Sequence, residues 1–156
     1  MNSTSKPTSL PQLFNKGLLL GSERLALTHG DLALTYRALD TKARRMAATV
    51  GTHGVGPDKT VAICLERSPE LIISVLGVLQ AGAAYVPIDP AYPADRIALM
   101  LEDAQPPVVI TDRSRGMLAL AAQRLTIVGR PRAHTRFVQA DAFALPRPLL
   151  HSGDLD

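Results

Sequence analysis

The side chains that could carry acid–base or metal chemistry are few in this sequence and lie far apart. Carboxylates are adjacent at Glu102 and Asp103, and lie near one another at Asp89 and Asp95. Adjacent helix residues point to different faces, and Asp89 precedes a proline in what we expect to be a turn. The four histidines, at positions 29, 53, 134 and 151, lack the spacing that places two on one helix face beside a carboxylate. We therefore assign these acids to capping, turns and solvation, and we predict neither a catalytic residue nor a metal site.

Cys64 is the only cysteine of the chain. One thiol excludes an internal disulfide framework and a metal cluster built on several thiolates. It lies in the apolar run TVAICL of residues 60–65. In such a run a buried, inert thiol is a better interpretation than a reactive one.

Three glycines at positions 51, 54 and 56 suggest a phosphate loop, but their direction is wrong for one. A phosphate loop follows a strand and opens a helix, so that the amides of the helix N-terminus face the anion. Here the stretch leaves an expected helix and enters an expected strand, so we interpret it as a helix stop. The sequence also lacks the Gly-x-Gly-x-x-Gly, Walker, His-Glu-x-x-His and Gly-x-Ser-x-Gly motifs. We predict no residue of this chain that binds a cofactor.

Arginines are concentrated in the last third of the chain, and the net charge of the whole chain is +3. A basic cluster can bind nucleic acid, but aromatic residues are not interleaved with it, and the chain has no Trp and only three Phe and three Tyr. A solvated basic face is the better interpretation, and a nucleotide- or nucleic-acid-binding α/β domain stays open as the weakest alternative. The arginines concerned are Arg113, Arg115, Arg124, Arg130, Arg132 and Arg136.

The hydrophobic pattern predicts strands that alternate with helices. Thr35 is a candidate N-cap of a first helix, with Leu34 and Leu39 as its hydrophobic staple. Ser68-Pro69 opens a second, nearly all-apolar helix, and Gly82 ends it. This alternation indicates an α/β fold with a mostly parallel sheet flanked by helices. The expected helices are a short one around residues 13–20 and others at 36–50, 71–80, 94–104 and 114–123; the expected strands are 60–65, 83–88, 108–111 and 125–128, with a strand or turn at 32–35.

The 156 residues suffice for one domain, which we divide into a flexible lead-in at residues 1–10, an α/β portion at 11–130 and a poorly structured tail at 131–156. The composition, 46% hydrophobic and 20% charged, is that of an ordinary globular protein. We find no signal peptide and no apolar run long enough to cross a membrane. We therefore expect a cytoplasmic protein.

Four segments of the chain form a recognisable series: LTYRAL (34–39), GVGP (54–57), VAICLERSPE (61–70) and VLQAGAAYVPIDPAYPADRI (78–97). Together they resemble the opening of the adenylation domains of nonribosomal peptide synthetases. These domains belong to the adenylate-forming superfamily, with acyl-CoA synthetases and luciferases. The order and spacing of the segments match over about residues 10–130, and the Asp-Pro-x-Tyr-Pro-x-x-Arg-Ile run resembles the amino-acid-activating branch.

The resemblance implies an ATP- and Mg-dependent activation of an amino acid as an acyl adenylate, followed by transfer to the thiol of a carrier protein. It also implies that the phosphate loop, the substrate pocket and the C-terminal domain with its lysine lie further along the chain than this sequence goes. No lysine follows Lys59, so neither of the family's lysines is present. The family's first motif has Glu where Ala38 stands, which removes half of a capping box.

The sequence therefore predicts a truncated N-terminal portion of an adenylation domain that is inactive alone and binds no cofactor by itself. An alternative is a docking or complementation protein, because truncation would leave apolar sheet surface exposed. The expected partners are the remainder of the domain or other synthetase domains, such as a carrier protein or a condensation domain, whereas membrane and nucleic acid are not expected partners.

Overall fold

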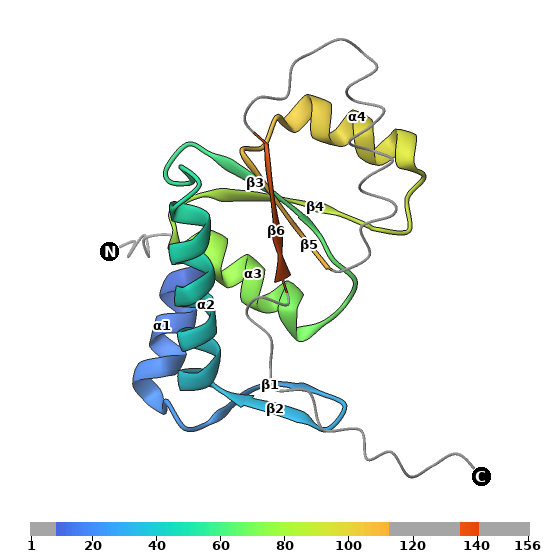
Figure 1. Cartoon of the computed structure of the whole chain (residues 1–156). Helices are drawn as coiled ribbons and strands as arrows, with labels where there is room; N and C mark the ends of the chain where they lie inside the picture. Colours follow the sequence, from blue (N-terminus) through green and yellow to red (C-terminus); the bar gives the residue numbers. More distant parts are fainter. Residues whose placement is uncertain (1–8, 113–134, 141–156) are drawn as a thin grey trace, which may run out of the picture.

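The structure is a computed structural model that describes residues 9–112 and 135–140. These residues form a two-stranded antiparallel hairpin, a four-stranded parallel sheet and four helices (Figure 1). In chain order the elements are α1 (Leu10–Leu20), β1 (Leu25–His29), β2 (Leu32–Thr35), α2 (Tyr36–Gly51), β3 (Thr60–Cys64), α3 (Pro69–Gln80), β4 (Ala84–Ile88), α4 (Ala94–Ala104), β5 (Val108–Thr111) and β6 (Arg136–Gln139).

The parallel sheet has the strand order β4-β3-β5-β6, and helices lie on both of its faces (Figure 1). The chain moves from β3 to β4 through α3 on one face, then returns past β3 to β5 through α4 on the other face. Because parallel strands need such crossovers, this order fixes which helix covers which face. The expected α/β class with a parallel sheet flanked by helices is confirmed.

Each face of the sheet has its own apolar cluster, as the two-residue period of a strand requires. On the α2 and α3 face, alternate strand residues such as Val61, Ile63 and Ile110 pack with the helices. On the α4 face, Ala62 and Val109 pack with that helix. All four residues of β5 are buried, as expected for an internal strand.

Helices α2 and α3 approach each other very closely at Gly77. A Cβ atom on Gly77 would lie 2.5 Å from Met46 Cβ and 2.9 Å from the Ala43 carbonyl oxygen. Met46 and Ala43 are themselves fully buried. Close packing of the two helices therefore requires that residue 77 have no side chain.

The helix boundaries largely follow the expected sequence signals. Ser68 Oγ accepts the Leu71 N–H at the start of α3, and Gly82, at φ +80°, follows the end of that helix. The Gly82 N–H donates to the Leu79 carbonyl and the Ala83 N–H to the Val78 carbonyl, which together form a Schellman motif. The predicted stop signals for α3 are confirmed.

Three findings differ from the sequence predictions or extend them. Strand β1 was not predicted; it pairs with β2 across the turn at Gly30 and Asp31. Within residues 131–156, for which we expected a poorly structured tail, Arg136–Gln139 form a strand that pairs with β5. The predicted helix at 114–123 and strand at 125–128 lie outside the described residues.

Candidate functional site

The carboxyl ends of β3, β4 and β5 define the place where this architecture positions a ligand site. In an open parallel sheet, ligands bind beyond the carboxyl ends of the strands, where connections leave neighbouring strands toward opposite faces. Here β3 leads into α3 and its neighbour β4 leads into α4, and these two helices cover opposite faces, so that point lies at the carboxyl ends of β3 and β4. The side chains at this edge are therefore the first candidates for a functional site.

Cys64 ends β3 at this edge and is only 2% exposed. Burial, together with the smaller effect of the nearby charges of Asp112 and Asp89, raises the pKa of its thiol to about 11. A thiol with this pKa stays protonated at neutral pH and is a poor nucleophile. The structure thus confirms the prediction of a buried, inert cysteine.

Asp89, which follows β4, stabilises the turn between β4 and α4. Its Oδ1 accepts the Ala91 N–H at 2.9 Å, and its carbonyl accepts the Tyr92 N–H at 3.1 Å. This is an Asx turn, as expected of an Asp that starts a turn. The guanidinium of Arg96 then lies 4.0 Å above the centre of the Tyr92 ring, which ties the turn to the first turn of α4. The segment from Asp89 to Arg96 therefore positions α4.

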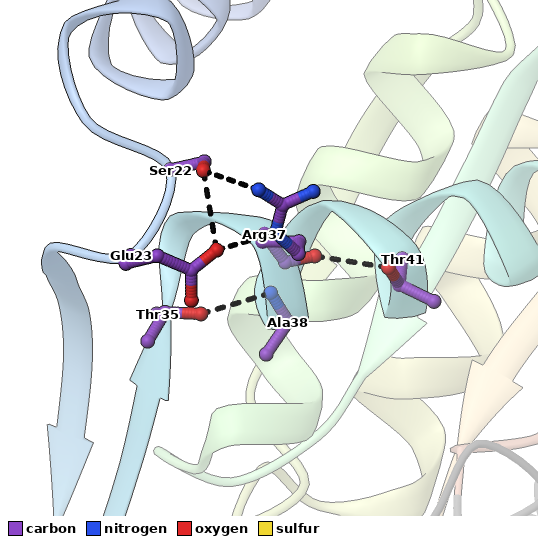
Figure 2. A network of polar contacts seen from close by, with 6 residues as sticks. All are labelled: Ser22, Glu23, Thr35, Arg37, Ala38 and Thr41. Atoms are coloured by element: carbon purple, nitrogen blue, oxygen red, sulfur yellow. Dashed lines mark hydrogen bonds and ion pairs between the residues drawn. The ribbon is translucent and has the colours of Figure 1, made fainter.

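The N-terminus of α2 is the best-organised polar region among the described residues (Figure 2). Thr35 Oγ1 accepts the Ala38 N–H, and the Arg24 and Ser22 carbonyls accept the Tyr36 and Arg37 N–H groups. These three amides of the first turn are already bonded, so they do not offer the free donors of an anion site.

An ion pair ties the same helix start to the segment before β1. The Arg37 guanidinium donates to the Glu23 carboxylate and to Ser22 Oγ, and Thr41 Oγ1 donates to the Arg37 carbonyl (Figure 2). The hydrogen bond from Arg37 and its charge lower the pKa of Glu23. The ion pair and the two backbone bonds, from Tyr36 N–H to the Arg24 carbonyl and from Arg37 N–H to the Ser22 carbonyl, together hold the start of α2 against this segment.

A second polar cluster lies between α2 and α3. Asp40, 8% exposed, accepts from Arg44 Nε at 2.6 Å and from Gln80 Nε2 at 3.0 Å. The hydrogen bond and charge of Asp40 raise the pKa of Arg44. The Asp40–Arg44 pair has the i, i+4 spacing of a helical ion pair, so the sequence could have identified it. Gln80 is forty positions away from Asp40, and no sequence signal links the two residues. The cluster joins the two helices and touches no open edge of the sheet.

The remaining candidates from the sequence do not converge in the described part of the chain. His29 lies in β1 and His53 follows α2, whereas His134 and His151 lie outside the described residues. Within residues 9–112 and 135–140, no group of three or more His, Cys, Asp and Glu side chains could hold a metal ion. Of the arginine cluster, only exposed Arg136 is described, whereas Arg113, Arg115, Arg124, Arg130 and Arg132 lie outside.

The other acids and the glycine stretch have the positions that the sequence predicted. Asp95 lies in the first turn of α4, and Glu102 and Asp103 occupy adjacent positions near its end. Gly54, at φ +78°, lies in the turn between α2 and β3, so the glycine stretch is a helix stop. Among the described helices, none is long and apolar enough to cross a membrane.

Comparisons of this chain with known protein families and with curated relatives agree on its family. Residues 20–154 match the model of the family described as "AMP-binding enzyme". The chain is 48% identical over 108 residues to the dimodular nonribosomal peptide synthase of Bacillus subtilis. The aligned segment covers 69% of this chain and 4% of that protein. It is also 36% identical to bacitracin synthase 3 of Bacillus licheniformis, in an alignment of 158 positions that covers 97% of this chain and 2% of that protein.

Solved structures agree with these relatives. A nonribosomal peptide synthetase crystallised with AMPPNP superposes with a TM-score of 0.70 at 31% identity, over 91% of this chain and 14% of that one. O-succinylbenzoate coenzyme A synthetase from Bacillus subtilis, at 22% identity and a TM-score of 0.70, shares the fold over 83% of this chain and 33% of its own.

The chain thus spans only a small share of the relatives and structures that it resembles. The family match extends beyond residue 130, where the sequence pattern could no longer be followed. The chain therefore belongs to the family of AMP-binding enzymes, and it corresponds to part of an adenylation domain of the nonribosomal peptide synthetase type.

Proposed function

We propose that this chain serves ATP-dependent amino-acid activation as the first part of an adenylation domain, and that it does not activate an amino acid without further residues. The observation that carries this proposal is the small share of its relatives that the chain spans: a solved synthetase matches 91% of this chain, and the match is 14% of that longer chain. At the candidate edge, burial and the charges of Asp112 and Asp89 keep the Cys64 thiol protonated.

Mg-ATP, which the family implies, does not fit the described residues. In-line transfer at a phosphate needs backbone amides, cationic side chains and Mg²⁺ arranged together, and among the described His, Cys, Asp and Glu side chains no group of three or more could hold the metal ion. Of the lysines in the described part of the chain, Lys16 is in α1, Lys42 in α2, and Lys59 precedes β3 at the amino edge of the sheet, away from the candidate edge. We therefore derive no catalytic step from this chain, and we assign it the role of a scaffold.

The proposal is tested by adding the missing part. The remainder of the adenylation domain of the dimodular synthase from Bacillus subtilis, beginning after the segment that aligns with this chain, is co-expressed with it and the complex is purified. Amino-acid-dependent exchange between ATP and labelled pyrophosphate is then measured. We expect exchange that requires Mg²⁺ and one amino acid. A purified complex that exchanges no label with any amino acid would contradict the scaffold role.

Docking or complementation in trans is the second candidate function. It is favoured by apolar side chains that the described residues leave uncovered, above all Leu19, 87% exposed, and Leu20, 68% exposed. Its partners would be the remainder of an adenylation domain, or a carrier or condensation domain of a synthetase. Because both functions draw on ATP, amino acids and synthetases, we place the chain in the cytoplasm.

A further inference from the structure

Helix α1 contains five leucines and one phenylalanine, yet none of its residues is buried. It contacts α2 and α3 from the outside of the helical layer (Figure 1). Tyr36, the first residue of α2, determines which side of α1 faces the protein. The Phe14 and Tyr36 rings lie 5.5 Å apart, and a Cβ on Gly17 would lie 2.5 Å from Tyr36 Cε1. Phe14 and Gly17 therefore point inward, and the opposite side of α1 faces solvent.

The solvent side of α1 carries leucines. Leu13 and Leu20 are seven positions apart and so share one flank of the helix. They are 53% and 68% exposed, and Leu19 is 87% exposed. We call Leu13, Leu19 and Leu20 the leucine face. Exposed large apolar side chains are normally scattered singly over a globular protein, so three on one short helix indicate a surface that contacts an apolar medium.

The charges beside the leucine face are positive. Lys16 is exposed and precedes the last two leucines by three and four positions, so it lies on their side of the helix. Arg24 is also exposed, and its Cδ lies 2.6 Å from where a Cβ on Gly21, at the end of α1, would be. No acidic residue precedes Glu23 in the sequence, and Glu23 is paired with Arg37. The leucine face therefore has a cationic border.

An anionic lipid surface fits this chemistry better than another protein does. Helices that lie in a membrane interface combine Leu or aromatic side chains with Lys and Arg, and they bind by apolar insertion and by attraction to anionic lipids. A second copy of this chain would place cations against cations. The core of a protein interface is enriched in aromatic residues and depleted in Lys. In α1 the aromatic residue is turned inward, because Phe14 packs on Tyr36.

We propose that α1 binds the surface of a membrane that contains anionic lipids, with the leucine face at the boundary of the acyl chains and with Lys16 and Arg24 at the lipid phosphates. The sequence predicts no membrane partner because it has no run that crosses a bilayer, but a helix in the interface needs no such run. The leucine face contains none of the residues at the carboxyl edge of the sheet. Lipid binding is therefore separate from the proposed scaffold role.

The test uses the full chain and sedimentation with lipid vesicles. Vesicles of phosphatidylcholine alone are compared with vesicles in which part of this lipid is replaced by phosphatidylglycerol. We expect binding to the anionic vesicles that weakens as salt is added, and little binding to the neutral ones. Amide hydrogen exchange should slow in α1 on binding and stay the same in α4. No binding, equal binding to both kinds of vesicle, or protection of α4 in place of α1 would overturn the proposal.

Two substitutions separate the apolar contribution from the electrostatic one. Leu19→Ala should weaken vesicle binding about tenfold, because an inserted side chain loses apolar area. Lys16→Gln removes one charge near the surface and should weaken binding about fivefold at low salt. Leu99→Ala is the matched control: Leu99 is 65% exposed on α4, but Asp95 and Asp103 lie four positions before and after it. This control should change binding less than about twofold.

All three substituted side chains are exposed, so each variant should keep the far-UV circular dichroism of the wild type. Equal vesicle binding by Leu19→Ala and Leu99→Ala would refute the role of the leucine face. A synthetase domain as the occupant would instead protect α1 in the complex with the co-expressed remainder, without vesicles. A second copy would give dimers in size-exclusion chromatography that Leu19→Ala separates. Either of these results would overturn the proposal.

Discussion

The close contact of α2 with α3 makes Gly77 the position where the smallest side chain should do the most damage. Gly77→Ala adds one methyl group. Its Cβ would meet Met46 Cβ at 2.5 Å, Met46 Cγ at 2.6 Å and the Ala43 carbonyl oxygen at 2.9 Å. The nearest atoms include a backbone oxygen and a Cβ, neither of which can rotate away, so the two helices must separate.

The expected loss of stability is the difference between two effects. Overpacking a tight core costs about 1–3 kcal/mol, and we expect the upper end here because both rigid contacts must move. Replacing Gly by Ala inside a helix returns about 1 kcal/mol through helix propensity. The net prediction is a free energy of unfolding lower by about 2 kcal/mol, measured by urea denaturation followed by far-UV circular dichroism.

Gly51→Ala is the matched control. Gly51 is the last residue of α2, and a Cβ there would meet no atom within 4 Å. The same substitution should therefore be neutral, or stabilising by about 0.5 kcal/mol. If Gly77→Ala proved as stable as Gly51→Ala, the close approach of α2 and α3 would be wrong.

Three further predictions concern an ionisation, a cap and a helix contact. The pKa of the Cys64 thiol is 9.0 without the fold and is raised to about 11 in it. Between these pH values the unfolded chain loses the thiol proton more readily than the folded chain, so the free energy of unfolding should fall as pH rises. Across that interval wild type should lose about 1–3 kcal/mol more than Cys64→Ala, in urea melts at each pH. Thr35→Ala removes the acceptor of the Ala38 N–H and should cost about 1 kcal/mol in the same assay; an unchanged midpoint would exclude the cap. Gly17→Ala places a Cβ 2.5 Å from Tyr36 Cε1, so amide exchange in α1 should speed up while that in β3 stays the same.

Local signals allowed much of the fold to be predicted. Ser68 with Pro69 and the glycine at position 82 mark the two ends of α3, and both act in the structure as the sequence indicated. The four-residue apolar run of β5 is buried throughout. These predictions succeeded because caps, stops and buried runs depend on residues that are neighbours in the chain.

Elements that depend on distant partners were harder to predict. The hairpin had a turn signal at Gly30, at φ +56°, but β1 is mostly exposed and has no strong apolar pattern. Strand β6 is short and takes its place by pairing with β5 and by burying Val138 in the core. The hydrogen bond from Gln80 to Asp40 likewise joins residues forty positions apart. Such pairings follow from tertiary packing, which local propensity does not determine.

The candidate site could not be located from the sequence, because its place depends on the order of the strands in the sheet. That order places it at the carboxyl ends of β3 and β4. The position of Asp89 in a turn and of Cys64 in the core could both be predicted from neighbouring residues, and both are confirmed. What the sequence could not foresee is that Asp89 and Asp112 both act on Cys64. Their convergence depends on the register of three strands.

The central claim is that this chain is a scaffold and needs further residues to activate an amino acid. Its most direct test is ATP–pyrophosphate exchange by the purified chain alone, with Mg²⁺ and each of the proteinogenic amino acids in turn. The account predicts exchange no faster than in buffer for every amino acid. Exchange that depends on the chain, on Mg²⁺ and on one amino acid would contradict it.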